Sequence, residues 1–366
     1  MITIGTVSRP QKKKRHVSCE YFAPWMVLSH TNMLNKDAKL APDVFSDTLE
    51  KKSTRDGFGA GVVHAGKENK NVVVLSADLK ESTRAEWFEK EFPERFIEMG
   101  VAEQNMATAA SGLAAVGKIP FITSYAAFSP GRNYEQIRTT IALNNRGVKI
   151  CGMHAGISVG LDGATHQMLE DIAMMRALPN MTVIVPVDAE EGRKATIAAA
   201  NTGTPVYLRF GRSNVPVFTT PETPFEIGKA LVLWDSSLGD SRIQTSVAFV
   251  ATGPLVYETL CAARALDAAG IGSVVVSLPT VKPLDEKTLL SVAKKVSKIV
   301  TIEEHQIAGG LGGAVAEYLS SIHPLPILRL GLRDEFGQSG EPEVLLAHYG
   351  LNTSGIVSAT RTFLHI

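Results

Sequence analysis

The sequence has little cysteine. Its 366 residues include three, Cys19, Cys151 and Cys261, and no two of them form a C-x-x-C pair. Isolated cysteines at these distances argue against a structural zinc site and against a disulfide framework. Free thiols are typical of a reducing compartment, so we expect a cytoplasmic protein.

Long hydrophobic runs and an excess of one charge are also missing. No apolar run reaches the ~18 residues needed to span a bilayer. The 37 Lys and Arg residues balance the 37 Asp and Glu residues, so the formal net charge is zero. A neutral chain has no bulk field for nucleic acid or an anionic membrane, and we expect it to bind neither. The basic cluster 12–15 precedes an apolar patch that Pro24 interrupts, which does not fit a signal peptide.

The sequence does contain a regular alternation of strand and helix patterns. Short apolar runs predict buried strands, and helical segments of ten or more residues separate them. This predicts an α/β fold with two doubly wound domains on mainly parallel sheets, at 43–215 and 226–366. Residues 216–225, rich in proline and threonine, are predicted to be a linker. Residues 1–42 show little periodicity and are interpreted as an N-terminal extension, for which disorder is one possibility.

Polar residues gather after the predicted strands of the first domain, where ligands bind open parallel sheets. Each has a structural explanation when taken singly. Glu103 fits a first-turn acid favoured by the helix dipole, and arginines such as Arg209 fit surface salt bridges. A metal site from His154, Asp162 and His166 stays open, although their spacing matches no standard ligand pattern. We expect no metal ligands in this chain.

Taken together, these segments resemble one family. They are EMGVAEQNM (98–106), SYAAF (124–128), HAGISVGLDGATHQ (154–167), RALPNMTVIVPVDAEE (176–191) and LRFGRSNVP (208–216), with SADLKES at 76–82. In this order and spacing they resemble the pyrimidine-binding domain of transketolase. TIEEHQIAGGLGGAVAE (301–317) resembles the C-terminal domain of the same enzymes. The resemblance covers about residues 43–366 and implies a thiamine-diphosphate-dependent transferase.

One part of that family's pattern is missing. Transketolases bind the cofactor diphosphate through Mg²⁺ and a Gly-Asp-Gly motif with a downstream asparagine. Here Asp-Gly occurs only at Asp56-Gly57 and Asp162-Gly163, and glycine precedes neither. The resemblance therefore implies the C-terminal subunit of a split transketolase, inactive alone, whose N-terminal partner subunit holds the diphosphate and Mg²⁺. By analogy the chain also dimerises with itself, which gives a two-plus-two heterotetramer.

The resemblance assigns residues to the cofactor. Glu103 matches the carboxyl group that hydrogen-bonds the pyrimidine ring and drives its proton transfer. Tyr125 and Phe128 match the aromatic slot for that ring, although the first of these is more usually phenylalanine. Asp78, after the first strand of the domain, is a further cofactor-binding candidate.

It also assigns residues to the substrates, which are sugar phosphates of the pentose phosphate pathway. A two-carbon ketol unit moves from a ketose phosphate to an aldose phosphate. His154 and His166 match catalytic histidines near the reacting groups, and Asp162 matches a residue that contacts a donor hydroxyl. The phosphate clamp is matched by a set of three residues, Arg55, Ser82 and Arg212, and arginine suits bidentate phosphate contact.

Three alternatives stay open. Deoxyxylulose-phosphate synthase shares the domain set, but its loop before Asp-Gly is one residue shorter and lacks the histidine that stands here at 154. The beta subunit of a 2-oxo acid dehydrogenase also lacks the diphosphate domain, but it has no Asp-Gly-x-Thr-His loop. A non-catalytic partner subunit is the third alternative.

Overall fold

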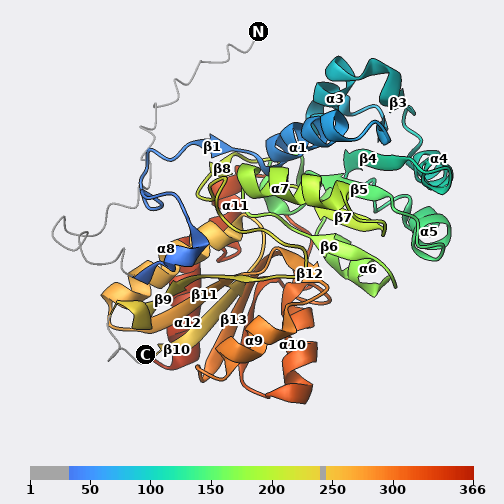
Figure 1. Ribbon diagram of the computed structural model, residues 1–366. Coiled ribbons are helices and arrows are strands. Elements are labelled where there is room, and N and C mark those ends of the chain that lie inside the picture. Colours follow the sequence, from blue (N-terminus) through green and yellow to red (C-terminus); the bar gives the residue numbers. More distant parts are fainter. Residues whose placement is uncertain (1–32, 240–244) are drawn as a thin grey trace, which may run out of the picture.

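The computed structural model describes residues 33–239 and 245–366, which form two α/β regions side by side (Figure 1). The first region contains a seven-stranded sheet with the order β12-β6-β7-β5-β4-β2-β3, parallel except for β12 against β6. Its strands are β2 (Val72–Ser76), β3 (Phe96–Glu98), β4 (Ile119–Tyr125), β5 (Lys149–Met153), β6 (Thr182–Ile184), β7 (Val206–Arg209) and β12 (Thr280–Lys282).

Helices cover both faces of this sheet, because its strands are apolar on both sides. Val72 and Val74 of β2 pack with the cluster under α1 and α7, whereas Val73 and Leu75 pack with the cluster under α4 and α6. The helices are α1 (Thr54–Glu68), α2 (Lys80–Thr83), α3 (Ala85–Glu91), α4 (Glu103–Ala115), α5 (Tyr134–Gln136), α6 (Asp171–Ala177) and α7 (Ala189–Ala200).

The second region repeats this layered plan on a five-stranded sheet with the order β14-β13-β10-β11-β9. Neighbouring strands in this sheet are parallel, except that β9 is antiparallel to β11. The strands are β9 (Leu231–Asp235), β10 (Thr245–Ala251), β11 (Gly272–Ser277), β13 (Lys298–Gln306) and β14 (Ile327–Leu332). The helices are α8 (Leu255–Ala268), α9 (Glu286–Ala293), α10 (Leu311–Ile322), α11 (Pro342–His348) and α12 (Thr353–Leu364).

The predicted α/β class with mainly parallel sheets is confirmed, but the two antiparallel strands were not predicted. Strand β12 belongs to the second half of the chain and still joins the sheet of the first region, through Thr280 opposite Ile184. It has three residues and ends before Pro283, so it carries too little pattern to be recognised in the sequence. The first sheet therefore includes a strand from beyond the predicted linker.

The segment 134–142 is not a regular α-helix. It begins as α5 and continues as a π-helix over Ile137–Ala142. The hydroxyls of Thr139 and Thr140 donate to the carbonyl oxygens of Glu135 and Gln136, four residues earlier. Threonines that bond back in this way compete with the helical hydrogen bonds and widen the turn.

Part of the predicted N-terminal extension is folded. The backbone N–H of Asn35 donates to Leu233 of β9 at 2.9 Å, and Ala38 is fully buried. The carbonyl oxygen of Lys39 accepts hydrogen bonds from Thr220 and Thr223 of the predicted linker. Residues 33–42 thus pack on the second region, and the basic cluster 12–15 lies outside the described residues.

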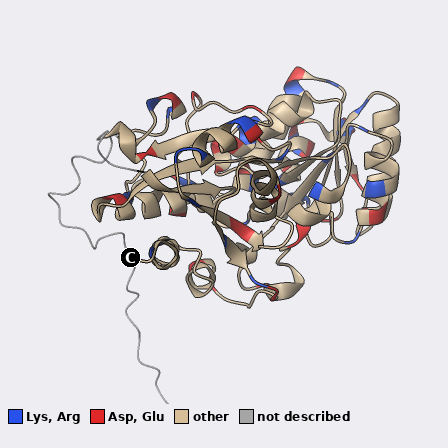
Figure 2. Cartoon of the chain, turned by 90° about the horizontal axis from the view of Figure 1, so that it is seen from below, with Lys and Arg blue, Asp and Glu red and all other residues tan. Residues whose placement is uncertain are grey.

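A short ladder and the surface complete the description. The two-residue strands β1 (Lys51–Lys52) and β8 (Val215–Pro216) pair where the chain enters and leaves the first region. Acidic and basic residues are interspersed over both regions (Figure 2). Within the described parts of the chain, no helix is both long enough and apolar enough to cross a membrane.

Candidate active site

Glu103 lies at the first turn of α4, just beyond the carboxyl edge of the first sheet. Its side chain is 1% exposed, and Oε2 accepts a hydrogen bond from Nη1 of Arg132 at 2.9 Å. The N-terminus of a helix stabilises a carboxylate, and the guanidinium adds an opposite charge. Arg132 was not among the predicted site residues, because nothing in its spacing distinguishes it from a surface arginine.

The predicted aromatic residues lie next to one another at the end of β4. The rings of Tyr125 and Phe128 are stacked, with centroids 5.8 Å apart and an angle of 25° between the planes. His166 meets both rings edge-on, at 6.0 and 5.6 Å. The guanidinium of Arg132 lies 5.0 Å from the Phe128 ring and so links this pair to Glu103.

This arrangement fits the ring of an aminopyrimidine. Two partly buried aromatic faces offer stacking surface, and the buried Glu103 carboxylate offers an acceptor for a ring N–H. Ser124, fully buried at the same strand end, has a hydroxyl without a hydrogen-bond partner in the described structure. The donor and acceptor set of this chain therefore matches the pyrimidine half of thiamine diphosphate.

His154 lies against a second group of predicted residues. Its Nε2 is 3.0 Å from Nη1 of Arg55, which also donates to the backbone oxygen of Ser82 at 2.7 Å. A guanidinium can only donate, so Nε2 of His154 accepts and its proton resides on Nδ1. Burial and the neighbouring Arg55 lower the pKa of His154 to about 3. A histidine that stays neutral in this way is better suited to hydrogen bonding than to proton transfer.

Asp162 and Arg212 form an ion pair at the mouth of the same site. Nη1 of Arg212 is 3.1 Å from Oδ2 of Asp162 and also donates to the backbone oxygen of Val159. Both side chains are about two-fifths exposed, at 39% for Asp162 and 43% for Arg212, so an incoming anion can reach the guanidinium. Arg212 therefore adds a second accessible positive charge near Arg55.

Of the predicted cofactor-binding residues, Asp78 alone lies apart from these contacts. Its side chain is exposed and its backbone N–H donates to Glu98, which also accepts from Gly100. Its φ of +62° places it in the left-handed region that favours glycine. The other predicted residues are joined by direct contacts or lie on the same loop.

Below the site lies a buried ion pair that the surface interpretation of Arg209 missed. Arg209 is 5% exposed, and its Nε donates to Asp171 at 2.7 Å. The Tyr207 hydroxyl donates to the same carboxylate oxygen at 2.6 Å. Although burial acts to raise it, Arg209 holds the pKa of Asp171 below its usual value. The interpretation of Arg209 as a surface salt-bridge partner was therefore wrong. The apolar residues that precede it in β7 were a sign in the sequence that this position is buried.

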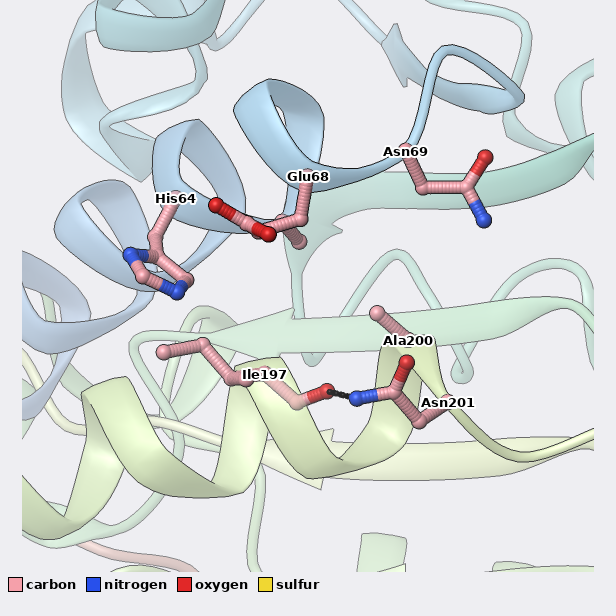
Figure 3. A pocket seen from close by; sticks show the side chains of 7 residues that line it. His64, Glu68, Asn69, Ile197, Ala200 and Asn201 are labelled. Atoms are coloured by element: carbon pink, nitrogen blue, oxygen red, sulfur yellow. Dashed lines mark hydrogen bonds between the residues drawn. The ribbon is translucent and has the colours of Figure 1, made fainter.

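One other place in the described chain, a small cavity, offers no better site. A small cavity of about 50 Å³ lies between α1 and α7, where His64 and Glu68 face Ile197 and Asn201 (Figure 3). It holds one hydrogen bond, from Asn201 to the Ile197 backbone oxygen, and none of the predicted residues. Among residues 33–239 and 245–366, no group of three or more His, Cys, Asp or Glu side chains could hold a metal ion.

Comparison with known proteins identifies both regions. Residues 50–217 match the family model of the transketolase pyrimidine-binding domain, and residues 240–356 match that of the transketolase C-terminal domain. Together these matches cover more than half of the chain.

Two relatives and one solved structure are similar over most of their length. A putative transketolase C-terminal section of Methanocaldococcus jannaschii is 44% identical over 308 residues, which are 83% of this chain and 94% of the relative. A 6-deoxy-6-sulfo-D-fructose transketolase subunit of a Clostridium species is 38% identical over 86% of this chain and 95% of its own. A structure described as a split gene transketolase, inactive beta4 tetramer, has a TM-score of 0.77 and 44% identity, over 85% of this chain and 97% of that one.

These matches agree with the order of the two regions and with the residues gathered at the edge of the first sheet. The chain belongs to the transketolase family and is composed of its pyrimidine-binding and C-terminal domains.

Proposed function

We propose that this chain is the C-terminal subunit of a split, thiamine-diphosphate-dependent transketolase that is active only with an N-terminal subunit. The main observation in support of this proposal is that a site for the cofactor ring and a site for a phosphate lie in contact with each other. Glu103 and the Tyr125–Phe128 pair form a slot for a pyrimidine, and His154, which touches the Tyr125 ring, links it to the positive charge of Arg55, with Arg212 nearby. A sugar phosphate that spans the two would present its carbonyl to the cofactor and its phosphate to the arginines.

The cofactor, when bound, supplies the nucleophilic carbon that attacks the ketose carbonyl. Glu103 would accept a hydrogen bond from the protonated ring nitrogen of the bound pyrimidine and so hold the proton at that atom. Tyr125 and Phe128 hold the ring by stacking and exclude water from its faces. These are the roles of this chain at the cofactor.

At the substrate, His166 is the candidate proton carrier, because it is half-buried beside both aromatic rings. Asp162 holds a donor hydroxyl. Arg55 and Arg212 bind the distal phosphate, and the Ser82 carbonyl group and neutral His154 orient the Arg55 guanidinium. His154 therefore acts in this proposal as a binding residue rather than as an acid or base.

The partner subunit completes the site. It holds the diphosphate and Mg²⁺, since this sequence contains no Gly-Asp-Gly motif. Two copies of each chain form the heterotetramer, with this chain also contacting its own copy. The exposed face of α4 is available for such contacts, because nothing lies within 4 Å of a Cβ at Gly112 and Val116 is 75% exposed. We place the enzyme in the cytoplasm, in the pentose phosphate pathway, consistent with two buried cysteines, Cys151 and Cys261, that are not joined in a disulfide.

The alternatives are less well supported. His154 occupies the position that deoxyxylulose-phosphate synthase lacks, and it contacts Arg55 rather than lying free in the loop. The loop from Asp162 to His166 is absent from the 2-oxo acid dehydrogenase beta subunits. A buried Glu103 beside two stacked rings is what a cofactor site needs, which argues against a non-catalytic subunit.

Reconstitution tests the proposal. The purified chain is mixed with the candidate N-terminal subunit, thiamine diphosphate and Mg²⁺, and ketol transfer from a ketose phosphate to an aldose phosphate is measured. We expect activity from the mixture and none from either subunit alone. Ketol transfer by this chain free of any partner, or a stable complex without transfer, would contradict the proposal.

A further inference from the structure

The loop that carries His154, Asp162 and His166 is held by contacts from the second region. The loop closes on itself where the Gly156 N–H donates to the backbone oxygen of Met168 at 2.9 Å. Between those points it contains short 3₁₀ turns and no strand or long helix that could fix its shape. Its geometry therefore depends on the groups that lie around it.

Glu304, on β13 of the second region, holds the first part of this loop. Its Oε1 accepts a hydrogen bond from the backbone N–H of Ser158, and its side chain is 5% exposed. A Cβ at Gly156 would collide with the same carboxyl group, and Gly156 has a φ of +90°. Glycine is needed here because the carboxyl group approaches the backbone so closely.

Glu304 also reaches the far end of the loop. Nη2 of the buried Arg209 donates to the backbone oxygen of Glu304 at 2.9 Å and to that of Met168 at 3.2 Å. One residue of β13 is thus linked to both ends of the loop, by its side chain at Ser158 and by its carbonyl group through Arg209.

A second contact with the second region holds the middle of the loop in place. Nε2 of Gln167 donates to Ile157 within the loop at 3.1 Å and to Gln338 of the second region at 2.9 Å. The backbone of Gly160 packs beside Gly340. None of these residues of the second region is one of the predicted ligand-contacting side chains.

We propose that Glu304 is a positioning residue of the active site, which sets the backbone of loop 154–167 so that His154, Asp162 and His166 face the sugar phosphate. This rests on the proposed function for its substrate, but the contact itself does not. Glu103, Tyr125 and Phe128 lie on other segments and meet the loop through the rings of His154 and His166, so cofactor affinity should depend on Glu304 far less than donor use does. Loss of the contact should loosen the loop and weaken donor use, with little change in cofactor affinity.

The first measurement uses the full chain alone and follows amide hydrogen exchange. In Glu304→Ala, the Ser158 N–H loses its acceptor, and its exchange should become about 10–100-fold faster, the scale of a hydrogen bond to a charged group. Glu304→Gln keeps an oxygen at that position and should exchange at nearly the normal rate. Glu304→Asp withdraws the acceptor by one methylene with less disturbance of the core, and should lie between. Unchanged exchange at Ser158 in both Glu304→Ala and Glu304→Asp would overturn the proposal.

The second measurement uses the assembled enzyme. Glu304→Ala should lower kcat/KM for a phosphorylated ketose by about 10–100-fold, since small misplacements of reacting groups have effects of this size. The dissociation constant of thiamine diphosphate should stay within about twofold, and Glu304→Gln should restore most of the rate.

Glu317→Gln is the matched control. It removes an ion pair between the two regions, Arg176 Nη2 to Glu317 Oε2 at 2.6 Å, without touching the loop, and should change neither exchange at Ser158 nor kcat/KM. Equal kinetic losses in Glu317→Gln and Glu304→Ala would overturn the proposal, as would faster exchange with unchanged kcat/KM. A wild-type complex without ketol transfer would overturn the proposed function, while the exchange result would still decide whether Glu304 holds the loop.

Discussion

The carboxyl edges of the two sheets present carboxylates in different ways. At the first sheet, Asp162 is partly exposed, and the buried Glu103 pairs with Arg132, whose side chain is about half exposed. At the second sheet, Glu303 and Glu304 are buried and accept hydrogen bonds from backbone N–H groups. Glu303 binds the first turn of α10, and Glu304 binds the loop of the first region.

This difference shows that carboxylates at the edge of the same kind of sheet can serve either ligand binding or the packing of the protein itself. The first region supplies side chains whose hydrogen-bonding capacity is available to a ligand. In the second region, burial raises the pKa of Glu303 to about 7 and also raises the pKa of Glu304, so these carboxyl groups serve packing and backbone geometry. Variants in each region should therefore fail in different steps, and the following experiments test this division.

The largest effect is expected at Glu103. Glu103→Gln keeps an oxygen for the Arg132 contact, so the fold should survive, but the proton held at the cofactor ring is no longer matched by a carboxylate. Turnover of the assembled enzyme should fall by about 10²–10⁴-fold. Steady-state kinetics at saturating cofactor measure this.

Glu86→Gln controls for the loss of one carboxylate, because Glu86 pairs with Lys90 on the outer face of α3. It should leave turnover unchanged. Near-normal turnover in Glu103→Gln would mean that Glu103 only matches the helix dipole.

A smaller and more selective effect is expected at Arg212. A guanidinium that holds the distal phosphate acts alike in the ground and transition states, so its loss raises KM and leaves kcat largely unchanged. Arg212→Ala should raise KM for phosphorylated donors by about 10–100-fold, the scale of 1.5–3 kcal/mol. Hydroxypyruvate has no phosphate and should be nearly unaffected.

The control for Arg212 is Arg193→Ala, which removes an arginine that pairs with Glu190 on α7. It should change KM for neither donor. Equal losses on both donors in Arg212→Ala would show that the Asp162 ion pair is structural, and the phosphate contact would then be sought at Arg55.

The smallest effect concerns the junction between the regions. Asp188, at the start of α7, accepts from the backbone N–H groups of Phe218 and Thr219 in the predicted linker. Burial and Asp188 raise the pKa of Glu191 to about 8, from an ordinary value of 4.5. The folded state therefore binds the Glu191 proton more tightly than the unfolded state does. The contribution of this proton to the free energy of unfolding is complete below about pH 4.5 and is lost as the pH rises through about 8.

The amide of Glu191→Gln does not ionise, so this variant should keep its stability as the pH rises. It can still accept the hydrogen bond from the Val187 N–H. Its melting temperature should match that of the wild type near pH 5 and exceed it by a few degrees near pH 9, since 1 kcal/mol shifts Tm by about 2–4 °C for domains of roughly 150–250 residues. Glu190→Gln controls for a charge removed from the same turn. A difference in Tm that is constant between pH 5 and pH 9 would contradict the assignment.

The sequence predicted well what depends on local pattern. Apolar runs such as 119–123 locate the parallel strands, and the segments that follow them contain most of the residues that meet at the site. Residue spacing, however, cannot show contacts between distant segments. Arg55 and His154 are 99 positions apart, and their 3.0 Å contact follows only from the order of the strands.

What the sequence did not reveal is the part played by the second region. Glu303 and Glu304 stand side by side after the apolar residues Ile299, Val300 and Ile302 of the same strand, which is a detectable signal because buried carboxylates require hydrogen-bond partners. The identity of those partners is decided by packing between the regions, for which a single sequence contains no pattern. Asp78 shows a different limit of sequence reasoning. A polar residue at a strand end does not necessarily point toward the site.

The central claim is that this chain holds the pyrimidine half of the cofactor and lacks the means to hold the diphosphate. Isothermal titration of thiamine diphosphate with Mg²⁺ tests it directly, with this chain alone and then with its reconstituted partner. We predict weak, Mg²⁺-independent binding by the chain alone and tight, Mg²⁺-dependent binding by the complex. Tight Mg²⁺-dependent binding by the isolated chain would contradict the account.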